Sequence, residues 1–141
     1  MTDVVIAIDP GLRIGVAWVT PEGRLLRHEV VDAAALATYD VPSGARVVVG
    51  DGTGSAALST ALRARGIAHE LVDEHGTSEE ARALFWRDHP PRGLARLVPA
   101  GLRPPPRSLD DYAAYAIALR VLAGEGATAT RPVPEDRPRR R

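Results

Sequence analysis

Short apolar runs separated by turns open the chain, and they predict an antiparallel meander. Residues 3–8 and 13–20 fit two strands joined by a Pro-Gly turn, and a Pro-Glu-Gly turn leads to a third strand at 24–31. Apolar runs of this length, bounded by Gly and Pro, are typical of strands. We therefore expect the first three strands to pair in sequence order and to be antiparallel.

After residue 31 the pattern alternates between helices and strands. Helical crossovers connect parallel neighbours, so the fourth and fifth strands should run parallel to the first. Thr77 with Glu80, and Ser108 with Asp111, have the spacing of a helix-capping box. The sequence predicts helices around 32–39, at 55–64, over about ten residues ending near 87 and at 109–123, with strands at 47–50 and 69–72.

The resulting fold class is α/β, with a mixed five-stranded sheet flanked by helices. The chain has 141 residues, which suits one domain, and we place it at 1–123. Segment 88–107 holds six prolines and is predicted to be irregular. The tail at 124–141, rich in Gly, Pro and Arg, is predicted to be disordered.

Composition narrows the class of protein. The hydrophobic fraction of 45% and the charged fraction of 26% are ordinary for a soluble globular chain. No apolar run approaches the ~18 residues of a transmembrane helix, and the N-terminus lacks the features of a secretory signal. The absence of cysteine excludes disulfides and thiolate metal sites. These features predict a cytoplasmic protein with no membrane partner.

The net charge is zero, but the cationic residues are clustered. All 18 are arginines, and residues 81–108 carry six of them against the single acid Asp88. Residues 131–141 carry five more against Glu135 and Asp136. Arginine suits bidentate contacts with phosphate, so the two stretches favour an anionic partner. Genome composition explains the all-arginine usage equally well.

Acidic residues follow each predicted parallel strand. Asp9 follows the first, Asp51 the fourth, and Asp73 with Glu74 the fifth. Ligand groups of open α/β sheets gather beyond the carboxyl ends of strands, so these acids should crowd at one edge and repel one another. Oxygen ligands of this kind suit one or two Mg²⁺ or Mn²⁺ ions, and two ions about 4 Å apart support phosphodiester hydrolysis.

The last predicted helix begins with two further acids, Asp110 and Asp111. Taken alone, they are explained better by capping and by the helix dipole. Together with the acids at the strand ends, they are candidate metal ligands. Several glycines near these acids would keep side chains out of the way or serve turns, namely Gly11, Gly15, Gly50, Gly52 and Gly54.

Three ordered motifs over residues 4–122 resemble a known family. IAIDPGLRIGVAWV resembles the opening of the bacterial Holliday-junction resolvases and of the YqgF (RuvX) family. VDEHGTSEEA resembles the D-E-R-x-T-[ST]-x-x-A segment of the YqgF family, and LDDYAAYAIAL resembles its last conserved helix. The resemblance implies an RNase H-like fold and a metal-dependent nuclease, associated with trimming the ends of precursor 16S ribosomal RNA.

The resemblance also implies residue roles. Asp9, Glu74 and Asp110 fall on the family's three catalytic acids, with Asp51 and Asp111 as additional candidate metal ligands. The arginine of the D-E-R motif is replaced by His75, which is a candidate substrate contact or proton shuttle. The GDGTGS loop and the long Pro-rich segment depart from the family pattern, which bears on substrate preference more than on fold.

The predicted partner is a nucleic acid, RNA rather than DNA, bound by a monomer or a homodimer. Alternatives are a junction-resolving DNA endonuclease, a binding module without turnover, an ATP-binding lobe of the actin and sugar-kinase class, and a ribosome assembly factor. The candidate phosphate contacts besides His75 are Arg13, Arg82, Arg87, Arg92, Arg96, Arg103 and Arg107.

Overall fold

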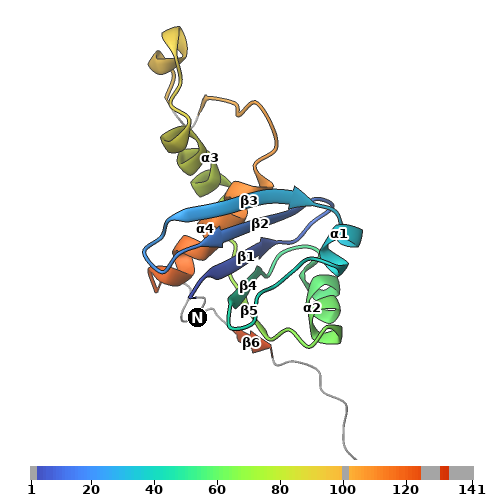
Figure 1. Cartoon of the computed structure of the whole chain (residues 1–141). Helices are drawn as coiled ribbons and strands as arrows, with labels where there is room; N and C mark the ends of the chain where they lie inside the picture. Colours follow the sequence, from blue (N-terminus) through green and yellow to red (C-terminus); the bar gives the residue numbers. More distant parts are fainter. Residues whose placement is uncertain (1–2, 100–101, 125–130, 134–141) are drawn as a thin grey trace, which may run out of the picture.

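One mixed sheet forms the centre of the computed structural model, which describes residues 3–99, 102–124 and 131–133 (Figure 1). The strand order is β3-β2-β1-β4-β5-β6. β1 pairs antiparallel with β2, β2 antiparallel with β3, and β1-β4-β5 run parallel, all as predicted. The strands are β1 Val5–Asp9, β2 Ile14–Val19, β3 Leu25–Val31, β4 Arg46–Gly50, β5 His69–Val72 and β6 Arg131–Val133.

Helices cover both faces of the sheet. α1 and α2 pack on one face, whereas α4 lies across the other and α3 packs against α4. None of the helices in the described ranges combines the length and the apolar character needed to cross a membrane. The helices are α1 Ala33–Ala37, α2 Ser55–Ala64, α3 Thr77–Asp88, the 3₁₀ helix η1 Gly93–Leu97 and α4 Asp110–Leu122.

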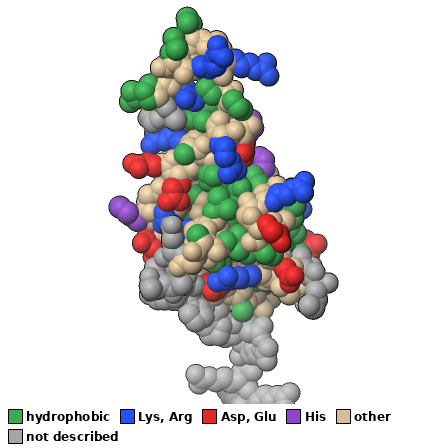
Figure 2. Space-filling model, turned by 90° about the vertical axis from the view of Figure 1, so that its left-hand side faces the viewer, with side chains coloured by type: hydrophobic (Ala, Val, Ile, Leu, Met, Phe, Trp, Pro, Cys, Tyr) green, Lys and Arg blue, Asp and Glu red, His purple; other side chains and the backbone are tan. Residues whose placement is uncertain are grey.

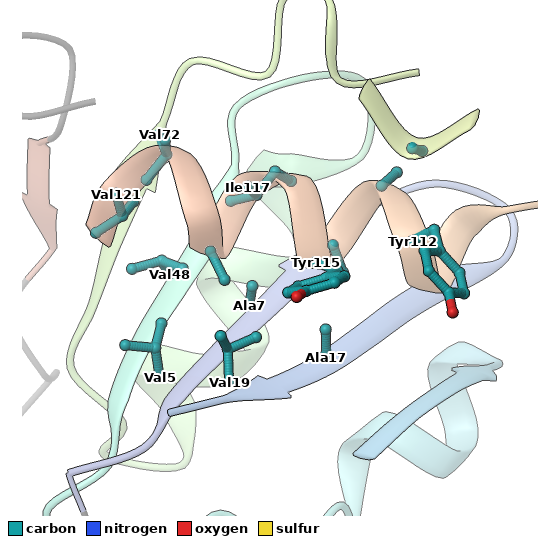
Figure 3. Close-up of a cluster of buried hydrophobic side chains, with 14 of the residues drawn as sticks. Val5, Ala7, Ala17, Val19, Val48, Val72, Tyr112, Tyr115, Ile117 and Val121 are labelled. Atoms are coloured by element: carbon teal, nitrogen blue, oxygen red, sulfur yellow. The ribbon is translucent and has the colours of Figure 1, made fainter. Parts of the chain in front are cut away.

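The alternation of side chains along the central strands builds two cores. Val5 and Ala7 of β1 face α4, whereas Ile6 and Ile8 face α1 and α2. Figure 3 shows the first core, in which α4 lies over valines and alanines of β1, β2 and β4. A strand buried on both faces explains the continuous apolar run in the sequence.

Two segments differ from the prediction. Arg131–Val133 forms β6, antiparallel to β5, inside the tail predicted to be disordered. The rest of that tail, 125–130 and 134–141, lies outside the described residues. The Pro-rich segment predicted to be irregular contains η1, because the stretch between its prolines is long enough for one short 3₁₀ helix.

Both predicted capping boxes are wrong. α3 has Gly76 as its N-cap and α4 has Leu109, and neither makes a side-chain capping bond. The predicted capping groups of α3 have other partners: the Thr77 hydroxyl donates to the Glu74 carbonyl three residues earlier, and Glu80 pairs with the distant Arg120 of α4. Local spacing therefore gave the helix starts within about two residues but not the contacts that fix them.

The N-terminal end of α4 lies directly on β2. A Cβ atom at Gly15 would overlap the backbone carbonyl of Asp110. Residues 111–118 of α4 are all buried, and four of them are alanines, which allow the helix to approach the sheet closely. Gly15 thereby sets how near Asp110 comes to Asp9, since Gly15 is the register partner of Asp9.

We expect Gly15→Ala to lower the free energy of unfolding by about 3 kcal/mol or more, because the added methyl meets backbone that cannot rotate away. Gly11→Ala is the matched control: its added methyl would meet only the Arg13 carbonyl oxygen, at 3.2 Å, and should cost less than about 1 kcal/mol. Urea unfolding of both variants measures the difference. Equal stability of the two would contradict this account of the α4 approach.

Candidate active site

The carboxyl ends of the three parallel strands place acids at one edge of the sheet, as predicted. Asp9 is the last residue of β1, Asp51 directly follows β4, and Asp73 directly follows β5. The Asp51 backbone N–H donates to the Val72 carbonyl at 2.9 Å, which extends the pairing of β4 and β5 by one step. Glu74, which follows Asp73, is thereby held beside the carboxyl ends of β4 and β5.

The Glu74 carboxylate occupies space that only glycines leave open. A Cβ atom at Gly50 or at Gly52 would overlap the carboxylate oxygens of Glu74. The Glu74 backbone is held by the Asp51 carboxylate, which accepts from its N–H at 3.3 Å, and by Thr77, whose hydroxyl donates to its carbonyl at 2.8 Å. Among the described residues, no hydrogen-bond donor reaches the buried Oε2 atom of Glu74. An anionic oxygen buried in this way is costly unless a cation pairs with it.

Asp110 approaches the same place from the first turn of α4. The Ser108 hydroxyl donates to Asp110 Oδ2 at 2.6 Å and orients the carboxylate. The positive end of the helix dipole favours a carboxylate there, so part of the capping and dipole explanation for Asp110 also holds. Asp9 and Asp110 line one cleft of about 270 Å³, together with Arg82 and Arg107.

The pKa of Asp9 is raised by its surroundings, which include the other two acids. Burial, repulsion from Glu74, a hydrogen-bonded contact with Glu74 and repulsion from Asp110 raise the pKa of Asp9 to about 8. Two carboxylates in contact favour a shared proton over two negative charges. Asp9 is therefore electrostatically coupled to both of the other acids inferred from the motifs, which come from two other parts of the fold.

The donor set fits a hard divalent cation. It consists of carboxylate oxygens, one of them buried and unpaired, and hard cations such as Mg²⁺ and Mn²⁺ prefer oxygen ligands. As they stand, no three His, Asp or Glu side chains in the described ranges converge closely enough to enclose an ion.

Asp111 and Asp51 were predicted as further metal ligands, but the structure gives both of them partners within the protein. Both carboxylate oxygens of Asp111 accept from Arg107, at 2.8 and 3.1 Å, and His28 Nδ1 lies 2.6 Å from Oδ2. Burial alone would raise the pKa of Asp111, but the bonds from Arg107 and His28 outweigh it and lower the pKa. Asp111, predicted as a metal ligand, is thus satisfied within the protein. Asp51 is exposed and is bonded to the Glu74 backbone.

The predicted phosphate contacts fall into separate groups. Arg82 and Arg107 line the cleft that contains Asp9. Arg87 lies apart, bonded to Asp88 and to the Tyr115 hydroxyl. Arg13 and His75 are exposed in the turns that follow β1 and β5, near the acids by sequence, and the remaining candidates lie between α3 and α4, namely Arg92, Arg96 and Arg103.

Reasoning from the sequence missed two residues that position acids at or beside the site, namely Ser108 and His28. Ser108 stands two residues before Asp110, and a hydroxyl beside an acid at a helix start was a usable signal. His28 lies 83 residues from Asp111 along the chain, and no local pattern connects them. The inferred role of Gly15, Gly50 and Gly52 is confirmed, since each excludes a Cβ atom from the place of an acid or its backbone.

A second cavity lacks the chemistry of this site. It has a volume of about 280 Å³ and lies between α1, α2 and the turn after β1. Its lining is apolar except for Arg65, whose guanidinium already donates to the carbonyls of Leu36 and Tyr39. The cleft at Asp9 is therefore the candidate active site.

Comparison with solved structures supports the fold. The structure is similar to RuvC of Thermus thermophilus in complex with a Holliday junction substrate, with a TM-score of 0.51 and 20% identity over 94% of this chain and 100% of that one. A second Thermus thermophilus RuvC structure gives a TM-score of 0.51 and 19% identity over 92% and 99% of the two chains. No protein-family model and no curated protein matches the sequence. The chain has an RNase H-like fold, as predicted.

Asp9→Asn should stabilise the protein in the absence of divalent ions, and increasingly so as pH rises from about 4 to about 8. The pKa of Asp9 is raised in the folded state, so the folded state binds more protons than the unfolded state in this window and wild-type stability falls with pH. We expect the free energy of unfolding of Asp9→Asn to exceed that of the wild type by about 2 kcal/mol at pH 8, a figure reduced because the Asp9 side chain is partly exposed to solvent. Urea unfolding in EDTA measures it, with the exposed Asp40→Asn as control. A gain that does not depend on pH would contradict the coupling.

Asp111→Asn should have the opposite effect. Arg107 and His28 lose their carboxylate partner, and we expect a loss of about 2 kcal/mol at pH 7. The figure is below that of a fully buried pair because the Arg107 and His28 side chains are 42% and 38% exposed. Because the folded pKa of Asp111 is lowered, the contribution is present above its ordinary pKa of 3.8 and is lost as pH falls through the lower folded value.

The control for Asp111→Asn is Glu70→Gln, which breaks the exposed pair with Arg46 and should cost less than about 1 kcal/mol. Thermal or urea unfolding between pH 3 and 8 compares the two variants. If Asp111→Asn cost no more than Glu70→Gln, the bonds of Asp111 with Arg107 and His28 would not stabilise the protein in the way inferred from its burial.

Proposed function

We propose that this chain is a divalent-metal-dependent nuclease that hydrolyses phosphodiester bonds. The observation that carries the proposal is the coupling of Asp9 to Glu74 and to Asp110. Asp9 and Asp110 also line a cleft whose other charged lining residues are Arg82 and Arg107. Carboxylates beside arginines match the two needs of the reaction, which are ligands for a cation and contacts for the phosphate backbone. The RNase H-like fold shared with RuvC is consistent with this chemistry.

Each of the chain's residues has a task in this proposal. Asp9, Glu74 and Asp110 hold one or two Mg²⁺ or Mn²⁺ ions, and Ser108 keeps the Asp110 carboxylate oriented. A cation held there supplies the activation of water and the neutralisation of charge that develops on the phosphate. Arg82 and Arg107 bind the phosphates that flank the scissile bond. Asp111 holds Arg107 at the cleft through two hydrogen bonds.

RNA is the proposed substrate, in the manner of the YqgF (RuvX) family and its role at the ends of precursor 16S ribosomal RNA. The three motifs that resemble this family support the choice, above all VDEHGTSEEA, which supplies Glu74. Cutting of junction DNA is the second candidate function, and the similarity to RuvC bound to a Holliday junction favours it. A cytoplasmic location and a monomer or homodimer complete the proposal.

A cleavage assay with matched substrates tests the proposal. Single-stranded RNA, structured RNA with overhangs, single-stranded DNA and a four-way DNA junction are each incubated with Mg²⁺, Mn²⁺ or EDTA. We expect cutting that requires the metal and that falls at least about a hundredfold in Asp9→Asn, Glu74→Gln and Asp110→Asn, because each removes a ligand. Asp40→Asn is the matched control and should cut like the wild type.

The substrate preference then decides between RNA processing and junction cutting. Cutting that persists in EDTA, or that is unchanged in Asp9→Asn, would contradict the assignment of the metal centre. Binding without any cutting, equal in wild type and Asp9→Asn, would replace the enzyme by a nucleic-acid-binding module.

A further inference from the structure

An exposed arm projects from the body of the protein between α3 and α4. We define the arm as residues 89–99, which include η1. Figure 1 shows η1 at the far end of α3, away from the sheet, and residues 92–99 are all exposed. Leu94 is 82% exposed and Leu97 is 80% exposed. Figure 2 shows hydrophobic and arginine side chains together at this tip.

The 3₁₀ geometry of η1 arranges these leucines into one ridge. Side chains three residues apart in a 3₁₀ helix lie above one another, so Leu94 and Leu97 share a face. Two large apolar side chains exposed to this degree gain nothing in the free protein, and adjacent exposed apolar groups indicate an interaction site. The ridge is therefore a candidate contact surface for a partner that offers an apolar surface.

The charge around the ridge points to the class of partner. No Asp or Glu occurs between residues 89 and 109, a stretch that carries four arginines. Arg96 donates only to the Gly93 carbonyl in the described structure, and the ion pairs found there do not include Arg92, Arg96 or Arg103. Arginines without an acidic partner can bind the phosphates of a nucleic acid, and an apolar ridge between them can pack against the faces of its bases. A nucleic acid therefore matches both the charge and the apolar character of the arm.

A second copy of the chain fits the arm less well. A two-fold contact would bring the arginines of both arms together, and like charges would repel. A stable dimer also buries about 800 Å² on each partner, which a ridge of two leucines is too small to supply.

The segment that follows the arm, residues 102–107, leads to the cleft. Pro105 and Arg107 of this segment line the cleft together with Asp9.

We propose that the arm binds nucleic acid at a place where base faces are exposed, such as the boundary between a duplex and a single strand. Leu94 and Leu97 pack against the faces of unpaired bases beside the end of the duplex, and Arg92 and Arg96 bind the flanking phosphates. In a duplex with flush ends nearly all base faces cover one another, so apolar side chains find base faces to pack against mainly where unpaired bases are present. The inference rests on the proposed function and adds to it the feature of the substrate that the enzyme recognises.

Binding of the full chain in EDTA tests this without requiring cleavage. Fluorescence anisotropy compares an RNA duplex carrying a single-stranded overhang with a flush duplex of the same paired length. We expect Leu94→Ala/Leu97→Ala to bind the overhang probe roughly tenfold more weakly than the wild type and the flush duplex within about twofold. Leu26→Ala removes an exposed leucine of β3 and is the matched control, with no change on either probe.

Arg92→Gln/Arg96→Gln should weaken binding to both probes and reduce the salt slope by about two, because two phosphate contacts are lost. An equal loss on both probes in the leucine variant, or no loss on either, would overturn the inference. So would a dimer, seen by sedimentation, that the leucine variant abolishes while binding is unchanged. Failure of metal-dependent cleavage with the probe-specific loss intact would remove the proposed activity and leave the arm as a binding element.

Discussion

The burial of the Asp9 carboxyl group beside Glu74 and Asp110 is the constraint on which the rest of the structure depends. Three carboxyl groups from β1, the loop after β5 and α4 are held at one edge of a buried sheet, and burial, together with repulsion from Glu74 and Asp110, raises the pKa of Asp9 to about 8. Such an arrangement opposes folding unless the body of the protein overcomes it. The two apolar cores on either side of the sheet supply that stabilisation. α4 contributes to one of these cores and also carries Asp110.

The placement of α4 shows how the protein separates stability from chemistry. Two adjacent acids begin this helix and point to different partners. Asp111 is buried, and it is neutralised by Arg107 and His28, whereas Asp110 faces the cleft with Asp9. One acid therefore fixes the helix, and its neighbour carries the charge that a cation would use. Gly15 makes the arrangement possible, because any side chain there would hold the helix away from β2.

The sequence was sufficient for the pairing of the first three strands, for the parallel direction of the next two and for the edge at which the acids meet. Apolar runs of strand length and the helices between them determine that topology, and motif resemblance singled out Asp9, Glu74 and Asp110. Asp111 could not be assigned correctly, because its partner His28 lies 83 residues away and only tertiary packing joins them. β6 escaped prediction for a related reason: a three-residue strand in a Pro- and Arg-rich tail is defined by the open edge of β5 and not by its own pattern.

Calorimetric titration of the full chain with Mn²⁺ at pH 7, in buffers of different ionisation enthalpy, tests the central claim most directly. A cation held by Asp9, Glu74 and Asp110 must displace the proton that the raised pKa of Asp9 retains, so binding should release about one proton in the wild type and none in Asp9→Asn. Release of that proton would show that the repulsion is resolved by a metal ion. No binding, or binding that is unchanged in Asp9→Asn, would contradict the claim that these three carboxylates form a metal centre, and binding without proton release would contradict the raised pKa of Asp9.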